Sequence, residues 1–270
     1  MLSASHPRPN ARPAARMTDS EPEIRAPEFN PYFVLKRALD AVAALLLLVL
    51  TAPLVLLAML LVKLTSRGPA LYSQTRLGAH GRPFTIFKIR TMVHECESLT
   101  GARWSAPGDA RVTPVGRWLR KTHIDELPQL WNVMRGDMSL IGPRPERPEF
   151  VPRLEQAIPH YRERLWIRPG VTGLAQVQLP PDTDLVSVRV KLAYDLYYLR
   201  NFGFWFDVRI YWATMLKMAG VPFRGIRWIF AFPSREAVNN EYNKLPAKPP
   251  RQSSAAKGKK SESEPVPVMS

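Results

Sequence analysis

Apolar residues are spread unevenly along this chain, and the longest apolar run lies near the N-terminus. Ala41 to Val62 contains no charged residue. At a rise of 1.5 Å per residue, about 22 helical residues cover a hydrocarbon core about 30 Å thick. The run therefore predicts a membrane helix, since a buried helix of a soluble protein is rarely this long and this uniformly apolar.

Two features bear on how this helix meets a bilayer. Pro53 removes a helical hydrogen bond, which predicts a break at Ala52 and Pro53. Basic residues flank both ends of the run, namely Lys36, Arg37, Lys63 and Arg67. A spanning helix usually carries its basic excess on one side, so this symmetry suits a bent helix whose ends return to one face. A re-entrant hairpin is therefore one alternative. Kinked spanning helices are common, however, and Thr51 can satisfy part of the freed backbone, so the residues alone slightly favour a spanning helix. A buried soluble helix is the third alternative.

The pattern beyond the apolar run predicts an α+β, mainly helical domain. Ala70 to Ser73 and Phe84 to Arg90 are aromatic and β-branched segments separated by glycine and proline, which predicts a small β-hairpin. Helical patterns dominate from Arg117 onward. The predicted helices are Glu126 to Met134, Glu149 to Arg164, Val186 to Asn201 and Asp207 to Ala219. The aromatic residues of the last two are expected mainly to pack in the core, with a position at lipid headgroup depth as the alternative.

Both ends of the chain differ in composition from its middle. Met1 to Glu28 is rich in proline, alanine and arginine and has no apolar core, so it is expected to be disordered. The composition shifts again from about Pro233, and Lys244 to Ser270 is rich in proline, lysine and serine, so 233–270 is expected to form a largely disordered C-terminal tail. Between them lie the membrane helix, 29–66, and a compact domain, 67–232.

The formal net charge of +15 predicts anionic partners. Nucleic acid, anionic lipid headgroups and a phosphorylated substrate all satisfy that prediction, and charge alone does not separate them. Cys96 is the single cysteine, so an intrachain disulfide is excluded, which fits a reducing compartment.

Two adjacent carboxylates, Asp125 and Glu126, are the strongest local signal for chemistry. Pro128 is tolerated in the first turn of a helix, so a helix is expected to start just before it, with Asp125 near the N-cap. At that end the helix dipole lowers a carboxylate pKa, and free N–H groups can bind phosphate. An ordinary pair of capping residues is the plainer interpretation of the spacing alone.

Basic residues in turn-like segments strengthen the interpretation of a phosphate site. A guanidinium binds phosphate through two hydrogen bonds, and neighbouring prolines reduce the entropy lost on binding. The candidate phosphate-binding cations are Lys88, Arg90, Arg120, Arg144 and Arg168. Each alone is more often a solvated surface charge, and it is their occurrence with a double carboxylate that favours an enzyme.

This residue set fits a defined chemistry. A carboxylate can attack phosphorus and form an acyl phosphate, provided that cations offset the charge of a diphosphate donor. Mg²⁺ suits the set because it takes one or two carboxylates plus substrate phosphates, and Asp125 is its expected ligand. His94 and His123 form no zinc pattern.

Six segments in fixed order extend this signal over most of the chain. They are KRALD at 36–40, GPALYSQTRLG at 68–78, FKIRTM, TPVGRWLRKTHIDELPQLWNVMRGDMSLIGPRPE, IRPGVTGLAQV and DLYYLRNF. In this order and spacing, from about Tyr32 to Lys217, the sequence resembles the bacterial sugar transferases of the small monotopic phosphoglycosyl transferase superfamily.

The resemblance implies a re-entrant helix broken at Ala52 and Pro53, in place of the spanning helix favoured above. It implies that Asp125 is the nucleophile, which attacks the β-phosphate of a UDP-sugar, releases UMP and retains the sugar phosphate. Glu126 would complete the dyad, with Mg²⁺ beside it. A polyprenyl (undecaprenyl) phosphate would then take up the sugar phosphate. The family's conserved cations match Lys88, Arg120, Arg144 and Arg168.

The resemblance also implies a location and a role. It predicts a monotopic protein of the bacterial inner membrane, with 67–232 as a catalytic domain on the cytoplasmic face. Expected partners are a UDP-sugar, polyprenyl phosphate and membrane lipid, without nucleic acid, and a homo-oligomer is compatible with the sequence. The reaction would be the first membrane step of exopolysaccharide, capsule, O-antigen or glycoconjugate synthesis. An inactive membrane-anchored scaffold and a basic nucleic-acid-binding protein are the alternatives.

Two departures from the resemblance affect what it implies. Leu174 replaces a tryptophan of many relatives, and QLPPDTD at 178–184 replaces an SGR-like or NGR-like motif. These changes do not affect the implied chemistry, but they leave the identity of the transferred sugar undetermined. The chain also lacks the several N-terminal transmembrane helices of larger relatives, so it is expected to be the minimal catalytic form.

Overall fold

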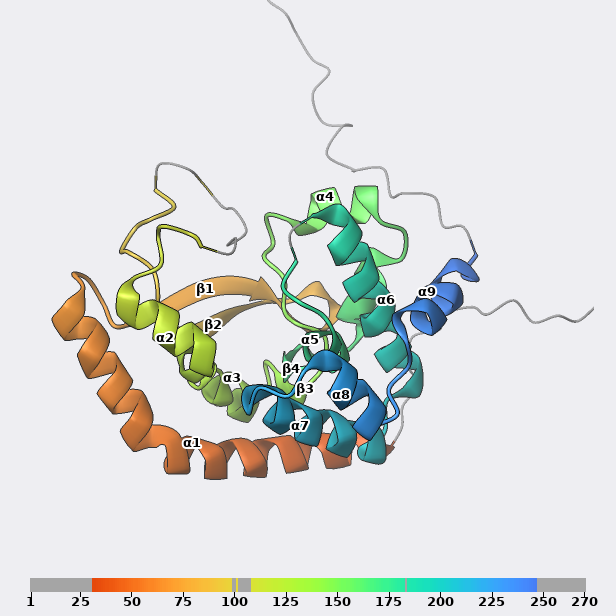
Figure 1. Ribbon diagram of the computed structural model, residues 1–270, viewed down its shortest axis with the longest axis horizontal. Coiled ribbons are helices and arrows are strands. Elements are labelled where there is room, and N and C mark those ends of the chain that lie inside the picture. Colours follow the sequence, from red (N-terminus) through yellow and green to blue (C-terminus); the bar gives the residue numbers. More distant parts are fainter. Residues whose placement is uncertain (1–30, 99–100, 102–107, 183, 247–270) are drawn as a thin grey trace, which may run out of the picture.

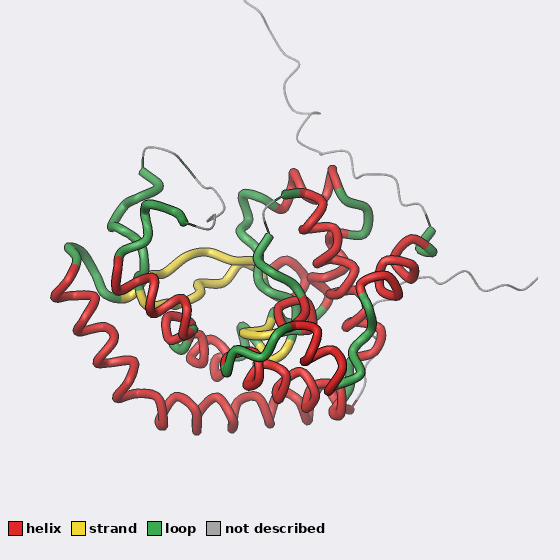
Figure 2. Tube along the Cα trace, viewed as in Figure 1, coloured by secondary structure: helices red, strands yellow, loops and turns green. Residues whose placement is uncertain are grey.

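The computed structural model describes residues 31–98, 101, 108–182 and 184–246, so the predicted N-terminal segment 1–28 lies outside the described residues. One long N-terminal helix runs along a mainly helical domain that holds two small sheets (Figures 1 and 2). The predicted mainly helical character is confirmed.

Helices make up most of the described chain. They are α1 Pro31–Thr65, α2 Pro114–Thr122, α3 Gln129–Arg135, α4 Val151–Ala157, α5 Leu174–Gln178, α6 Leu185–Asn201, α7 Phe204–Met218, α8 Phe223–Ile229 and α9 Arg235–Asn243. The strands are β1 Leu71–Leu77, β2 Pro83–Ile89, β3 Ser139–Ile141 and β4 Gly170–Thr172. Short 3-10 turns occur at Ala79–Gly81, Ile124–Glu126 and Tyr161–Trp166.

Helix α1 is long and apolar enough, by length and composition, to cross a membrane. It bends along its course in Figure 1, and Pro53 lies inside it. The missing N–H of Pro53 leaves one carbonyl of the preceding turn without its helical donor. Two residues earlier, the Thr51 hydroxyl donates to the Leu47 carbonyl at 2.7 Å, a contact that often accompanies helix bending.

Both halves of α1 pack on the same domain through small or β-branched residues. In the first half, Ala44 is fully buried in a cluster with Ile86 of β2 and Val133 of α3. In the second half, Ala58 and Val62 are buried in a cluster that also contains Ile89, Leu119 and Ile124. Many other leucines of α1 point outward, whereas Leu47 and Leu48 pack against the first cluster. The leucines that are at least half exposed are Leu35, Leu46, Leu50, Leu56, Leu57, Leu60 and Leu64.

The predicted hairpin is present as β1 and β2. The two strands pair antiparallel, from Leu71 opposite Ile89 to Leu77 opposite Pro83. The second sheet is absent from the prediction: β3 and β4 are three residues long and pair parallel, with Ser139 beside Gly170 and Ile141 beside Thr172.

Of the four predicted helices, the last two form as α6 and α7. The predicted helix 149–164 is interrupted: α4 ends at Ala157, and a 3-10 turn follows from Tyr161. The cause is Pro159, because a residue that precedes proline is pushed out of the helical region. Accordingly, Ile158 has the extended angles φ −130° and ψ 114°.

The predicted tail is wrong for its first part. Helix α9 lies inside the segment 233–270 and packs against α6. Its Val238 is 1% exposed and its Tyr242 is 8% exposed. The Tyr242 hydroxyl donates to the Pro159 carbonyl at 2.8 Å. Residues 247–270 lie outside the described residues.

Candidate active site

Asp125 and Glu126 lie in the 3-10 turn between α2 and α3. His123 ends α2 with a left-handed backbone, φ 56° and ψ 15°, which turns the chain sharply into Ile124. The predicted N-cap position of Asp125 is wrong, since the N-cap of α3 is Pro128 and no side chain caps this helix. The acids therefore sit in a turn that precedes the helix.

Two cations hold Glu126 in place. Its Oε1 accepts from Nη2 of Arg144 at 2.5 Å and from Nζ of Lys88 at 2.9 Å. Nη1 of Arg144 donates to Oε2 at 3.2 Å. Burial opposes ionisation, but Arg144 and Lys88 outweigh it and hold the pKa of Glu126 well below its usual range. Glu126 is thus a fixed carboxylate that orients two cations.

The surroundings of Asp125 shift its pKa in the opposite direction from that of Glu126. Its residue is 6% exposed, and among the described residues no side-chain hydrogen bond to its carboxylate occurs. Burial, reinforced by the negative charge of Glu126, raises the pKa of Asp125 to about 6, although Lys88, Arg120 and Arg144 act against the rise. The lowered pKa expected from a helix dipole is therefore wrong for Asp125. This carboxylate is ionised at neutral pH, but its surroundings stabilise the ionised form less than water does.

Arg120 is positioned by a close contact between α2 and the end of β2. A Cβ on Gly116 would lie 2.0 Å from the Thr91 carbonyl oxygen, so a side chain at this position would separate the two segments. Just before α2, the Thr113 hydroxyl accepts from the Gly116 N–H at 2.9 Å and caps the helix. One turn further on, Nε of Arg120 donates to the Thr91 hydroxyl at 2.8 Å.

Arg144 is positioned by a crossing of two backbone segments. A Cβ on Gly142 would lie 2.6 Å from the Arg168 carbonyl oxygen, so the segment GPRP passes directly against IRPG. Gly170 N–H donates to the Pro143 carbonyl at 2.8 Å. Behind the loop, the buried Arg164 donates to the Arg144 carbonyl at 2.8 Å. This packing fixes the backbone that presents the Arg144 guanidinium to Glu126.

The other two predicted cations point toward α1. Nη2 of Arg90 donates to the carbonyl and hydroxyl oxygens of Ser66, at 3.0 and 2.8 Å, just beyond the C-terminus of α1. A cation is stabilising at that end of a helix. Burial lowers the pKa of Arg168, which interacts with Asp40 and Arg37. The structure thus brings Lys88, Arg120 and Arg144 to the two acids, while Arg90 and Arg168 face α1.

Two further basic residues, His123 and Lys217, belong to the site. Burial lowers the pKa of His123, which also interacts with Glu126 and Lys217. Burial, followed by repulsion from Arg144, lowers the pKa of Lys217, and Glu126 opposes that shift. Lys217 comes from α7, far along the chain, and no motif in the sequence marks it. From the sequence, Lys217 can be noticed only as a basic residue in the last turn of a largely apolar helix.

Comparison with known proteins decides the family. The family model described as bacterial sugar transferase matches residues 31–220, which include α1, both sheets, the two acids and the cations around them.

The chain belongs to the bacterial sugar transferase family.

Named relatives agree with this assignment. The chain is 50% identical over 182 residues to a UDP-glucose:undecaprenyl-phosphate glucose-1-phosphate transferase of Caulobacter vibrioides, covering 67% of this chain and 68% of that protein. It is 45% identical over 184 residues to a UDP-N-acetylgalactosamine-undecaprenyl-phosphate N-acetylgalactosaminephosphotransferase of Aeromonas hydrophila, covering 68% of this chain and 43% of that protein. It is 40% identical over 189 residues to the exopolysaccharide production protein PSS of Rhizobium leguminosarum, covering 68% of this chain and 94% of that protein.

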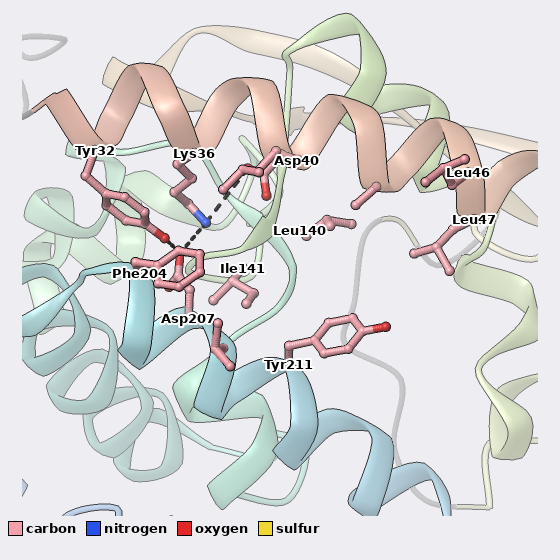
Figure 3. A pocket seen from close by; sticks show the side chains of 13 residues that line it. Tyr32, Lys36, Asp40, Leu46, Leu47, Leu140, Ile141, Phe204, Asp207 and Tyr211 are labelled. Atoms are coloured by element: carbon pink, nitrogen blue, oxygen red, sulfur yellow. Dashed lines mark hydrogen bonds and ion pairs between the residues drawn. The ribbon is translucent and has the colours of Figure 1, made fainter.

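A second polar cluster of the chain anchors α1. Lys36 lies 2.6 Å from Asp207 of α7, which also accepts from the hydroxyls of Tyr32 at 2.6 Å and Tyr198 at 2.7 Å. Figure 3 shows Tyr32, Lys36 and Asp207 of this cluster beside a mainly apolar cavity between α1, β3 and α7. The cavity has a volume of about 380 Å³. Because Asp207 is satisfied by three donors, we interpret the cluster as a structural anchor and not as a reaction site.

The donor set beside Glu126 fits a magnesium ion that is held partly by phosphate oxygens of a ligand. Among the described residues, no group of three or more histidine, cysteine, aspartate or glutamate side chains is placed to hold a metal. The oxygens of Glu126 are engaged by Arg144 and Lys88, whereas those of Asp125 are not. One carboxylate plus substrate phosphates is an ordinary set for Mg²⁺, so Asp125 fits.

Proposed function

We propose that the protein transfers a sugar 1-phosphate from a UDP-sugar to a membrane polyprenyl phosphate, which the names of its relatives specify as undecaprenyl phosphate. The products would be UMP and a polyprenyl diphosphate sugar. The observation that carries the proposal is the pairing of a weakly stabilised, buried Asp125 with a Glu126 that holds two cations. The reaction would begin exopolysaccharide, capsule, O-antigen or glycoconjugate synthesis.

The chemistry would proceed in two displacements at one phosphorus. First, an oxygen of Asp125 attacks the β-phosphorus of the UDP-sugar; the bond from that phosphorus to the UMP oxygen breaks, and UMP leaves with the electron pair. Then an oxygen of the polyprenyl phosphate attacks the same phosphorus, and the Asp125 carboxylate leaves. Lys88, Arg120 and Arg144 would offset the charge that builds on the phosphoryl oxygens in both steps.

Mg²⁺ is proposed as the cofactor, held by Asp125 together with substrate phosphate oxygens. When bound, it would neutralise part of the diphosphate charge. Glu126 would orient Lys88 and Arg144 toward the substrate phosphates. Burial would keep the Asp125 carboxylate poorly solvated until substrate binds.

For α1, we propose a re-entrant arrangement, broken at Ala52 and Pro53, in the bacterial inner membrane with the catalytic domain on the cytoplasmic face. The support is that small residues in both halves of α1 pack on one domain, while the leucines face outward. A helix that crossed the bilayer would carry one of its ends away from that domain. The arrangement would bring the site to the bilayer surface, where a lipid phosphate and a soluble nucleotide sugar meet.

The covalent step has a direct test. Purified protein with Mg²⁺ and a UDP-sugar, without lipid acceptor, should release UMP up to about one equivalent per enzyme, as expected for an intermediate that accumulates. Mass spectrometry should find the sugar phosphate on the peptide that contains Asp125. Asp125→Asn should abolish both signals.

The control is Asp137→Asn, which removes an acid of the same motif that pairs with Arg135 at 3.4 Å on the surface. This variant should retain the UMP burst and the adduct. Full turnover of the wild-type protein without burst or adduct would instead indicate direct transfer to the acceptor. Absence of turnover with every UDP-sugar tested would refute the proposed function.

A further inference from the structure

Lys217 is a partly buried cation that no acidic side chain binds. Among the described contacts, its Nζ makes one hydrogen bond, to the backbone carbonyl of Gln176 at 2.7 Å. It also lies 5.7 Å from the centre of the Phe223 ring. An ammonium group has three donors, so two remain for a ligand. This differs from Lys88 and Arg144, which Glu126 holds.

Hydrogen bonds connect the end of α7 directly to the loop that carries Arg144. The Thr214 hydroxyl of α7 lies 2.8 Å from the Thr172 hydroxyl of β4. The Thr172 carbonyl accepts from the Gly142 N–H at 2.9 Å, two residues before Arg144. Lys217 follows Thr214 by three positions and therefore lies on the same side of α7. The electrostatic interactions of Lys217 with Arg144 and Glu126 agree with this placement.

The site therefore holds more positive than negative charge. Lys88 and Arg144 donate hydrogen bonds to Glu126. Arg120 interacts electrostatically with Asp125, and Lys217 interacts electrostatically with Glu126. Placing a partly buried cation near another cation is unfavourable unless an anion completes the arrangement. A phosphate group supplies such an anion, and Lys is a common phosphate ligand as a point charge.

We propose that Lys217 binds a phosphate group of the substrate at the Asp125–Glu126 site. The inference rests on the proposed function, and the phosphate can belong to the diphosphate of the nucleotide sugar or to the lipid acceptor. Lys217 would position this phosphate from α7, together with the cations of β2 and the Arg144 loop.

The test compares Lys217→Gln with Lys217→Arg and with Arg224→Gln. Arg224 is an exposed residue of the neighbouring helix α8, so its replacement makes the same change in charge without a described contact to the site. Lys217→Gln should reduce kcat/KM about 10- to 100-fold, the usual effect of losing a charge-assisted hydrogen bond. Lys217→Arg should recover most of the loss, and Arg224→Gln should stay within about twofold of wild type.

Separate measurements identify the source of the phosphate. If the donor diphosphate is bound, Lys217→Gln raises the donor KM and slows the UMP burst without acceptor. If the acceptor phosphate is bound, the burst is unchanged and the acceptor KM rises. Either result supports the proposal, provided that the thermal unfolding midpoint matches wild type.

Two outcomes would overturn the inference. The first is a Lys217→Gln variant with both KM values and the burst within twofold of wild type. The second is equal loss in the Gln and Arg variants with a lowered unfolding midpoint, which indicates a packing role. A wild-type protein that releases no UMP refutes the proposed function instead, so the two failures are distinguishable.

Discussion

Adjacent acids at positions 125 and 126 have different ionisation properties because their neighbours differ. Glu126 accepts hydrogen bonds from Lys88 and Arg144, and its pKa is held well below its usual range. Asp125 is buried beside that charge, and its pKa rises to about 6. Pairs of titratable groups whose environments push their pKa values apart are typical of sites that divide chemical roles. Here Glu126 holds two cations, and the proposed nucleophile is Asp125.

The first prediction concerns Asp125→Asn. The pKa of Asp125 rises from 3.8 to about 6 on folding. An acid with a raised pKa in the folded state destabilises the fold above that pKa, and the penalty disappears as the pH falls toward 3.8. Asp125→Asn should therefore increase the free energy of unfolding at pH 7.5 by roughly 2 to 3 kcal/mol, while it abolishes UMP release.

Thermal unfolding in detergent with a metal chelator measures this effect. The difference in stability between Asp125→Asn and wild type should be smaller near pH 4.5 than at pH 7.5. A variant that unfolds at a lower temperature than wild type at pH 7.5 would contradict the burial argument.

The second prediction concerns the Glu126–Arg144 pair. Arg144→Met leaves the buried Glu126 with Lys88 as its remaining cation. The fold should lose about 3 kcal/mol, the usual effect of breaking a buried ion pair from one side. Chemical denaturation should show that Glu126→Gln combined with Arg144→Met is less destabilised than the sum of the single variants. Strict additivity would mean that the pair is not coupled.

At the scale of elements, α1 combines two kinds of surface. Ala44, Ala58 and Val62 are at most 2% exposed against the domain. Large apolar side chains cover the opposite side, as at Leu50, which is 76% exposed. Near the N-terminus of the helix, Lys36 reaches Asp207 and the Ser139 hydroxyl donates to Asp40 at 2.6 Å. Packing therefore holds one side of the helix to the domain and leaves large apolar side chains exposed on the other side.

The third prediction tests the re-entrant arrangement of α1. In a Cys96→Ser background, Val34→Cys and Arg67→Cys place one thiol near each end of α1, at exposed positions. A membrane-impermeant thiol reagent should label both from the same side of sealed vesicles. Pro53→Leu restores the missing backbone donor and favours a straight helix, so part of the protein should then expose the two ends on opposite sides. Labelling of the unaltered helix from opposite sides would establish a spanning helix.

At the scale of the whole molecule, the fold extends beyond the segment that the family shares. The family match ends at residue 220, yet α8 and α9 contribute Ile226, Val238 and Tyr242 to the largest core cluster. Arg227 of α8 donates to the buried Gln178 at 3.0 Å. The C-terminal helices are therefore part of the domain that supports α6 and α7.

The fourth prediction is that deletion of residues 221–270 prevents stable folding. It removes Ile226, Phe232, Val238 and Tyr242 from the core. Each buried apolar side chain contributes about 1.5 to 3 kcal/mol, so their sum is comparable with the whole stability of a domain. As a control, Trp228→Ala removes a side chain that is 85% exposed and should change stability by about 0.5 kcal/mol or less. Yield and thermal unfolding measure both, and a truncated protein with the wild-type midpoint would refute the argument.

Several elements could be predicted because local pattern determines them. The apolar run around Pro53 indicates a membrane helix by its length and composition, and the β1–β2 hairpin follows from strand patterns around a glycine turn. The predicted helix from Val186 forms as α6, for which the structure adds Asp184 as the N-cap. The pairing of β3 with β4 could not be predicted, since three-residue strands carry no periodicity and meet only when distant segments pack. Helix α9 was not predicted for a related reason. Its segment is polar overall, and only Val238 and Tyr242 are buried against the domain.

The sequence by itself determined that an apolar helix, a small hairpin and a pair of adjacent acids occur in one chain, and its ordered motifs determined the family. These are properties of neighbouring residues, which composition and spacing record directly. Tertiary structure decided which cations reach the acids, that Arg90 and Arg168 face α1, that Lys217 joins the site, and that Asp125 has a raised pKa. The physical reason is that burial and charge–charge interactions depend on distance in space, which only the packing of α1, α7 and the two sheets sets.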